Sequence, residues 1–138
     1  MKPTHIEHIG IAVKDLAAAI DFYEKVLGLT CYNVEELTDQ KVRTAFFMVG
    51  QTKIELLEST EPDGPLGKFI EKRGEGIHHI AFSVEKIEEQ LDRASKLGIT
   101  LIDSKPRKGA EGLDIAFLHP KSTSGVLIEL CESKHITP

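Results

Sequence analysis

The sequence predicts an α+β protein built from two tandem βαβββ modules, because two short segments each occur twice at nearly the same spacing. The segment EHIGIAV at residues 7–13 recurs as HHIAFSV at residues 78–84. The segment KIEL at residues 53–56 recurs as LIEL at residues 127–130. The copies lie 71 and 74 positions apart, so the two halves of the chain keep a similar internal register.

The first module begins with a strand and a helix. Residues 5–13 are almost continuously apolar, which is typical of a buried strand. Asp15 can cap the helix that follows, and Gly28 can end it in a left-handed conformation. Apolar side chains recur at helical spacing between them, which predicts one buried helix face. Three strands are expected next, at residues 29–37, 41–49 and 52–59, the last two joined by a tight turn.

The second module repeats this plan. A strand at residues 77–84 is followed by a helix at about residues 86–97, and Gly98 can end that helix. Residues 104–112 are polar and basic, and we expect them to form a surface loop. The remaining strands of this module are expected at residues 99–103, 113–119 and 126–132.

The length of the chain, 138 residues, fits a single domain with a core of its own. We therefore expect one domain over residues 1–138. Module 1 is placed at about residues 4–60 and module 2 at about residues 76–132, and the linker at about residues 61–75 contains a turn and a short helix.

Composition excludes several classes of protein. Lys and Arg number 17 against 22 Asp and Glu, for a formal charge of −5, and no long basic run is present, so nucleic acid is not expected as a partner. No apolar stretch is long enough for a membrane span, and the N-terminus lacks a signal-peptide pattern, so a cytoplasmic protein is expected. Two cysteines are too few for a disulfide framework.

Each module places one His and one Glu on a strand. Side chains alternate across a strand, so His8 shares a face with Gly10, and the large apolar residues between them point the other way. Glu55 and Glu129 alternate with apolar neighbours in the same manner. A carboxylate on such a strand needs a partner, because burying it unpaired costs several kcal/mol.

A divalent metal would supply that partner for both modules at once. Two imidazoles and two carboxylates suit Co²⁺, Mn²⁺, Ni²⁺, Fe²⁺ or Zn²⁺, and they leave positions open for water or substrate oxygens, as in catalytic sites. A lone strand His or Glu is more often a surface or hydrogen-bonded residue than a ligand. The recurrence of both residue types favours the metal interpretation, with His8, Glu55, His79 and Glu129 as ligands.

These paired modules and their four ligands resemble the vicinal-oxygen-chelate superfamily, which includes glyoxalases, bleomycin-resistance proteins and dioxygenases. The resemblance covers residues 4–132. It implies that the two modules form a curved mixed sheet, a cup around a central metal site. The implied cofactor is one divalent metal ion, with Co²⁺ the first choice.

Within the superfamily, four motifs are most similar to the methylmalonyl-CoA epimerase family. They are QTKIELLE at residues 51–58, GIHHIAF at residues 76–82, HPK at residues 119–121 and GVLIEL at residues 125–130. The resemblance implies an isomerase that interconverts (2R)- and (2S)-methylmalonyl-CoA by removing and returning the α-proton through a metal-stabilised enolate. Inversion of the centre requires an acid/base group on each face of the substrate.

The identity of the second acid/base group is open in the sequence. The resemblance assigns Glu129 as metal ligand and as base on one face. Some epimerases of this family carry a Glu where this chain has Thr44, and Thr cannot act as a base near neutral pH. Glu55, released from the metal, is the first candidate for the second base. Glu35, Glu36 and a water molecule held by Thr44 are weaker candidates.

Two other functions compete with the epimerase. The first is a glyoxalase I-like lactoylglutathione lyase, whose chemistry also passes through an enediolate, and the second is a small-molecule binding protein without catalysis. The implied substrate is an acyl-CoA, and the superfamily implies a homodimer. Contacts to this substrate are expected from Thr44 and from five basic residues, Lys105, Arg107, Lys108, His119 and Lys121.

Overall fold

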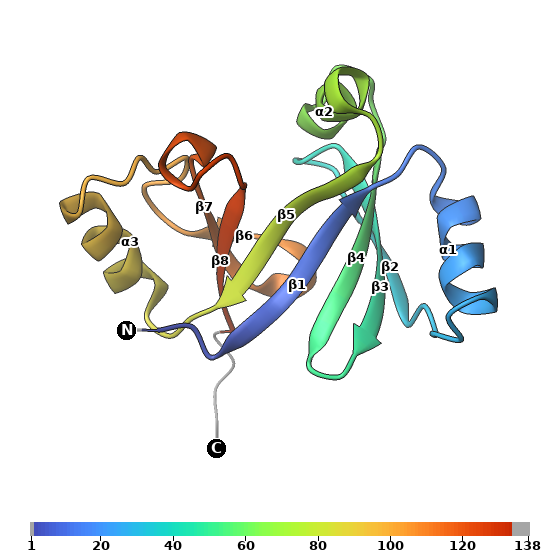
Figure 1. Cartoon of the computed structure of the whole chain (residues 1–138), viewed down its shortest axis with the longest axis horizontal. Helices are drawn as coiled ribbons and strands as arrows, with labels where there is room; N and C mark the ends of the chain where they lie inside the picture. Colours follow the sequence, from blue (N-terminus) through green and yellow to red (C-terminus); the bar gives the residue numbers. More distant parts are fainter. Residues whose placement is uncertain (1, 134–138) are drawn as a thin grey trace. The chain divides into compact units, whose positions relative to one another are not determined.

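Residues 2–133 are described by the computed structural model (Figure 1). The chain forms two units. The first unit contains residues 8–78, and the second unit contains residues 2–7 together with residues 79–133. Each unit contains parallel and antiparallel strand pairs and its own helices.

The sheet of the first unit has the strand order β2-β3-β4-β1. Strand β1 runs parallel to β4, and the pairs β3–β4 and β2–β3 are antiparallel. The strands are β1 His5–Ala12, of which residues 8–12 belong to this unit, β2 Asn33–Leu37, β3 Val42–Val49 and β4 Thr52–Ser59, and the helices are α1 Leu16–Lys25 and α2 Pro65–Arg73.

Helix α1 covers one face of this sheet. Its N-cap is Asp15, whose carboxylate accepts a hydrogen bond from the Ala18 N–H at 3.1 Å, as the sequence predicted. The helix buries Leu16 against Phe47 of β3, which is fully buried, and the Tyr23 ring lies 5.4 Å from the Phe47 ring. This apolar cluster is the core on the α1 side of the sheet.

Helix α2 packs on the opposite face, against Val42 and Leu57, which alternate with the residues that contact α1. Helix α2 requires a glycine at position 67, where it lies close to the backbone of the preceding loop. A Cβ on Gly67 would lie 2.6 Å from the Pro62 carbonyl oxygen, so only glycine allows this approach. The α2 face also carries the first module's predicted ligands.

The sheet of the second unit has the strand order β5-β8-β7-β6, which repeats the plan of the first unit. Strand β5 runs parallel to β8, and the pairs β7–β8 and β6–β7 are antiparallel. The strands are β5 Gly76–Ser83, of which residues 79–83 belong to this unit, β6 Arg107–Lys108, β7 Asp114–Leu118 and β8 Ile128–Glu132. The helix is α3 Ile87–Lys96, and two short 3₁₀ helices are η1 Ala110–Gly112 and η2 Pro120–Ser122.

The repeat extends to a pair of glutamates that fix the starts of α1 and α3. Glu58 on β4 accepts a hydrogen bond from the Leu16 N–H at 2.9 Å. Glu132 on β8 accepts hydrogen bonds from the backbone N–H groups of Lys86 at 2.8 Å and Ile87 at 3.0 Å. The α3 N-cap, Lys86, provides no side-chain cap of its own, so Glu132 satisfies donors that would otherwise lack a protein partner.

Replacement of Glu132 by Ala is expected to lower the free energy of unfolding by about 1–2 kcal/mol, because two backbone donors at the start of α3 lose their acceptor. Urea unfolding of the two proteins would measure the difference. The exposed Glu85, just before α3, offers a matched control, and Glu85→Ala should leave the urea midpoint nearly unchanged. Equal midpoints for Glu132→Ala and the parent protein would contradict this account.

The predicted α+β class with two equivalent modules is confirmed, and two strand predictions are wrong in part. No strand covers residues 99–103 in the described chain. Leu101 forms a single isolated bridge with Leu118, the Asp103 carboxylate accepts the Phe117 N–H at 2.9 Å, and ladder pairing with β7 resumes at Arg107. Strand β2 begins at Asn33, because the Cys31 N–H donates to Glu24 of α1. The single-domain boundaries stay a prediction.

None of the helices in residues 2–133 has the length and hydrophobicity needed to cross a bilayer.

Candidate functional site

His8 and Glu55 lie together on the α2 face of the first unit. In the parallel pair β1–β4, Gly10 is opposite Glu55, so His8 and Glu55 share a face one step apart. The His8 Nδ1 atom lies 3.1 Å from Glu55 Oε2. Both residues are buried, with exposed fractions of 3% and 4%. The first unit thus forms the His–Glu pair that its sequence segments predicted.

His79 and Glu129 form the equivalent pair in the second unit. Ala81 is opposite Glu129 in the parallel pair β5–β8, and the His79 Nε2 atom lies 3.1 Å from Glu129 Oε1. Both residues are buried. His78 points to the other side of β5, as predicted, and its ring packs edge-on against Phe69 of α2. Two histidines and two glutamates therefore occupy equivalent buried positions in the two units.

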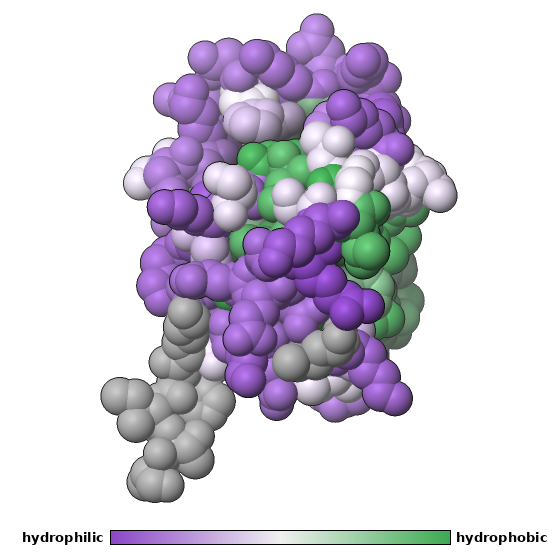
Figure 2. Space-filling model, turned by 90° about the vertical axis from the view of Figure 1, so that its left-hand side faces the viewer, coloured by the Kyte–Doolittle hydropathy of each residue, from purple (hydrophilic) through white to green (hydrophobic). Residues whose placement is uncertain are grey.

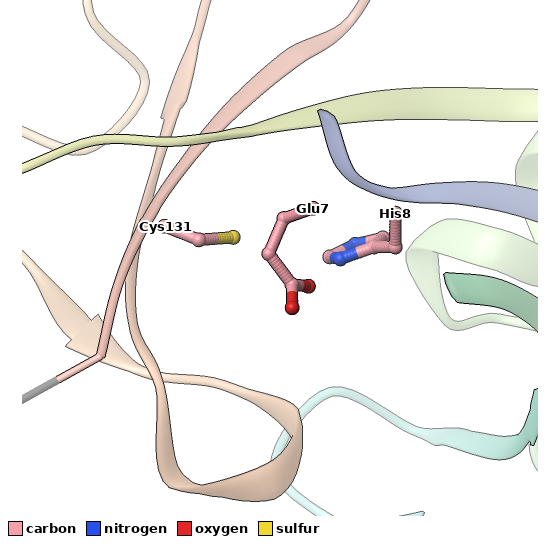
Figure 3. Close-up of side chains that lie close together, drawn as sticks. All are labelled: Glu7, His8 and Cys131. Carbon is pink, nitrogen blue, oxygen red and sulfur yellow. The ribbon is translucent and has the colours of Figure 1, made fainter. Parts of the chain in front are cut away.

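Cys131 and Glu7 adjoin the second pair, and neither residue is among those predicted from the sequence. The Cys131 thiol donates a hydrogen bond to Glu129 Oε2 at 2.8 Å, so both carboxylate oxygens of Glu129 have a contact. The Glu7 carboxylate comes within 4.8 Å of the Cys131 sulfur, and both side chains extend into the same space in Figure 3. Alternation along β8 could have indicated Cys131, since residues 129 and 131 share a face.

The donor atoms in both pairs fit a divalent metal. Imidazole nitrogens and carboxylate oxygens are ligands for the borderline and hard divalent ions that the sequence suggested. A buried carboxylate beside a histidine in each unit is the arrangement that a bound cation would stabilise, because an unpaired buried carboxylate is costly. Within each unit, the residues that could bind a metal are its buried His and Glu, which are His8 and Glu55 in the first unit and His79 and Glu129 in the second.

Thr44 is fully buried on β3, on the face of the sheet that carries Glu55. Of the two nearby carboxylates suggested as acid/base groups, Glu35 lies directly opposite Thr44 on β2 and is half-buried. Glu36 points to the other face, where it forms an ion pair with Arg43 at 3.1 Å. The structure thus places these two neighbouring glutamates on opposite faces of the sheet, a difference that the sequence alone does not show.

The basic residues predicted to contact substrate lie in different surroundings. Arg107 is opposite Ile115 on β7, on the face that carries Glu129, and its guanidinium lies 5.6 Å from the Phe117 ring centre. Lys108 points to the other face and forms an ion pair with Asp114 at 2.8 Å.

Lys105 lines a groove of about 620 Å³ beside α3, together with Leu91 and Leu101. Figure 2 faces the side of the molecule that carries α3 and shows apolar surface enclosed by hydrophilic side chains. His119 and Lys121 are both exposed, and His119 Nδ1 accepts the Lys121 N–H at 3.1 Å, which caps η2. Arg107 is thus the one of these five basic residues that the strand register places on the Glu129 face.

The family of the chain follows from its sequence. Residues 7–117 match the family described as the Glyoxalase/Bleomycin resistance protein/Dioxygenase superfamily. The chain therefore belongs to this superfamily, which the repeated His and Glu segments predicted. Proteins of this superfamily typically bind a divalent metal.

Individual proteins and solved structures are similar to this chain over most of its length. The uncharacterized protein YqjC of Bacillus subtilis (strain 168) is 49% identical, over 94% of this chain and 92% of its own length. The ethylmalonyl-CoA/methylmalonyl-CoA epimerase of Cereibacter sphaeroides is 39% identical, over 91% of this chain and 95% of its own. A solved structure of methylmalonyl-CoA epimerase in complex with methylmalonyl-CoA and NH4+ has a TM-score of 0.94 and 37% identity, covering 99% of this chain and 100% of that one. The last match also supports the α+β fold class.

Proposed function

We propose that the chain is a metal-dependent methylmalonyl-CoA epimerase that interconverts the (2R) and (2S) forms of its substrate. The observation that carries this proposal is the buried His–Glu contact of 3.1 Å at equivalent positions in both units. Relatives that are epimerases of acyl-CoA thioesters support it over nearly the whole chain. The enzyme class expected from the sequence, an isomerase acting on a CoA thioester, is confirmed by these relatives.

In this proposal, the four residues His8, Glu55, His79 and Glu129 bind one divalent metal ion, with Co²⁺ the first choice. The metal, when bound, supplies a Lewis acid that stabilises negative charge on the oxygens of the substrate. Glu129 has the chemistry for proton transfer, since a carboxylate can take the α-proton on one face of the substrate and return it. Contacts of its two oxygens with His79 and Cys131 hold the carboxylate in one orientation.

The remaining predictions from the sequence keep that status. Glu55 stays a predicted metal ligand and a predicted second acid/base group, and its Oε2 atom lies 3.1 Å from His8 Nδ1. Arg107 is the predicted substrate contact with the most support, because the strand register puts it on the Glu129 face, where its guanidinium also pairs with Asp103 at 3.1 Å. The homodimer and the cytoplasmic location also stay predictions.

The proposed function is tested by exchange of the substrate α-proton with solvent deuterium. We expect the metal-loaded protein, incubated with (2S)-methylmalonyl-CoA in D₂O, to exchange the α-proton and to produce the (2R) form, because inversion removes that proton and returns one from the protein. Mass spectrometry and chiral analysis of the product measure both events. A metal-free sample serves as the control and should show much slower exchange.

Each competing function has a different outcome in the same set of assays. Formation of S-lactoylglutathione from methylglyoxal and glutathione, without exchange of methylmalonyl-CoA, would replace the epimerase by a glyoxalase I-like lyase. A protein that binds no divalent metal and exchanges no proton would be a binding protein. Either result would contradict the proposed epimerase.

A further inference from the structure

The thiol of Cys131 is bound to the carboxylate of Glu129 inside the second unit. The Cys131 Sγ atom donates to Glu129 Oε2 at 2.8 Å, and Glu129 Oε1 lies 3.1 Å from His79 Nε2. Cys131 and Glu129 are both buried, with exposed fractions of 1% and 4%. A thiol is a weak donor, but a charged acceptor makes a hydrogen bond roughly twice as strong, and burial keeps competing water away.

The position of Cys131 on β8 fixes the direction of its thiol. Residues 129 and 131 share a face of the strand because they are two apart. On that face Cys131 packs in an apolar cluster with Ala81 of β5 and Ile115 of β7. A cysteine side chain has a single rotatable bond to its sulfur, so close packing of this kind holds the Sγ atom against Glu129.

The repeat shows that the fold does not require a cysteine at this position. Glu55 of β4 is the counterpart of Glu129, and Leu57, two residues further along, is the counterpart of Cys131. Leu57 is buried and packs with apolar residues of its own unit. A buried free cysteine often acts only as a small apolar residue, but here its hydrogen is bound to a predicted ligand. The thiol therefore has a use besides packing.

We propose that Cys131 is a positioning residue for Glu129, a role that rests on the epimerase function proposed for this chain. By binding Oε2, the thiol keeps the carboxylate from turning about its terminal bond and leaves Oε1 directed to His79. A carboxylate already held in one orientation has less freedom to lose when it binds a metal or takes a proton. Residues that hold a metal ligand in this way typically contribute about 10–100-fold to metal affinity or activity.

Infrared spectroscopy of the metal-free protein tests the contact itself, because the S–H stretching frequency falls as the hydrogen bond made by the thiol becomes stronger. The chain has two cysteines, and the band that disappears in Cys131→Ala belongs to Cys131. We expect Glu129→Gln to move this band to higher frequency, since a neutral amide is a weaker acceptor than a carboxylate. Glu132→Gln, the same change on the opposite face of β8, should leave the band in place.

Two substitutions at position 131 separate the hydrogen-bond donor from packing. Cys131→Ala and Cys131→Ser both remove the sulfur, but only serine keeps a hydrogen to donate to Glu129. With metal at saturation, we expect Cys131→Ala to slow α-deuterium exchange of methylmalonyl-CoA by about 10-fold, with KM near the parent value. Cys131→Ser should retain most of the parent rate. Urea unfolding of both variants measures the cost of the altered packing, so a loss of stability is not mistaken for a loss of positioning.

Cys31, the other cysteine of the chain, provides the matched control. It belongs to the first unit, and its thiol donates to the Asn33 carbonyl oxygen at 3.4 Å. Cys31→Ala should therefore leave the exchange rate near the parent value. Titration of the metal-free proteins with Co²⁺ gives a readout apart from activity. We expect Cys131→Ala to bind the ion about 10-fold more weakly than the parent protein, and Cys31→Ala to bind it equally well.

Four results would overturn the role of Cys131. If Cys131→Ala matches Cys31→Ala in exchange rate and in Co²⁺ affinity, the thiol positions nothing, and the epimerase function still stands. An S–H band that moves in Glu7→Gln and not in Glu129→Gln would assign the thiol hydrogen to Glu7, whose carboxylate is within 4.8 Å of the sulfur. A thiolate-to-cobalt absorption band that is lost in Cys131→Ala would make Cys131 a ligand instead. A parent protein without any exchange would overturn the proposed function, although the S–H band would still report the contact.

Discussion

Glu129→Gln is expected to lower kcat for epimerisation by about 10³-fold or more, the largest effect of any single change on activity. The substitution removes a proton-transfer group, whose contribution is typically about 10²–10⁴-fold, and it replaces a charged metal ligand by a neutral one. It also alters the contacts with the His79 Nε2 atom and the Cys131 thiol. Steady-state kinetics with both enantiomers would measure the loss, and metal content measured in parallel would show how much of it reflects weaker metal binding.

Glu132→Gln is the matched control for this experiment. It makes the same chemical change three residues along β8, on the opposite face of the strand. The Gln carbonyl can still accept a hydrogen bond at the start of α3, so the fold should persist. We expect kcat to stay near the parent value, because Glu132 contacts backbone groups at the start of α3 and not the predicted ligands. Comparable losses of kcat in both variants would show that Glu129 has no special part in the reaction.

Phe47→Ala should produce the largest loss of stability, about 3–5 kcal/mol in the free energy of unfolding, because removing a buried aromatic side chain leaves a cavity. Phe47 of β3 is fully buried under helix α1, and its ring lies 5.4 Å from the Tyr23 ring, measured between centroids. Urea unfolding followed by circular dichroism would measure the change. A variant that is too unstable to purify would agree with this expectation.

Phe22→Ala is the control for the cavity effect. Phe22 is on the same helix as Tyr23 but is 50% exposed. The same change should therefore cost only a small part of the Phe47 value, since much of the ring is already in contact with water. Losses of similar size at the two positions would mean that the α1 cluster is not the core of the first unit.

The buried positions of His and Glu in each unit could be predicted from the sequence because two simple rules apply to them. Alternation along a strand separates His8 and Glu55 from the large apolar residues beside them on their own strands, and the repeat assigns the same arrangement to His79 and Glu129. Neither rule requires knowledge of distant contacts. The 3.1 Å contacts within each unit agree with both rules.

Other features depend on contacts between strands and could not be read from local pattern. The sequence does not reveal that Glu35 pairs opposite Thr44 while Glu36 binds Arg43, because register is set by the whole sheet. The strand expected at residues 99–103 failed for a similar reason, since the Asp103 side chain takes the hydrogen bond that a strand would have taken. Side-chain acceptors of this kind compete with regular pairing and leave little trace in hydrophobic periodicity.

The paired glutamates of β4 and β8 also bear on how the chain avoids misfolding. On β4, Glu55 faces the histidine and Glu58, three residues later, faces the helix start, and β8 repeats this with Glu129 and Glu132. A slip of either strand by one residue would exchange the two faces and deprive both carboxylates of their partners at once. The two charges on each strand thus favour the correct register, because a strand shifted by one residue would leave two carboxylates without their hydrogen-bond partners.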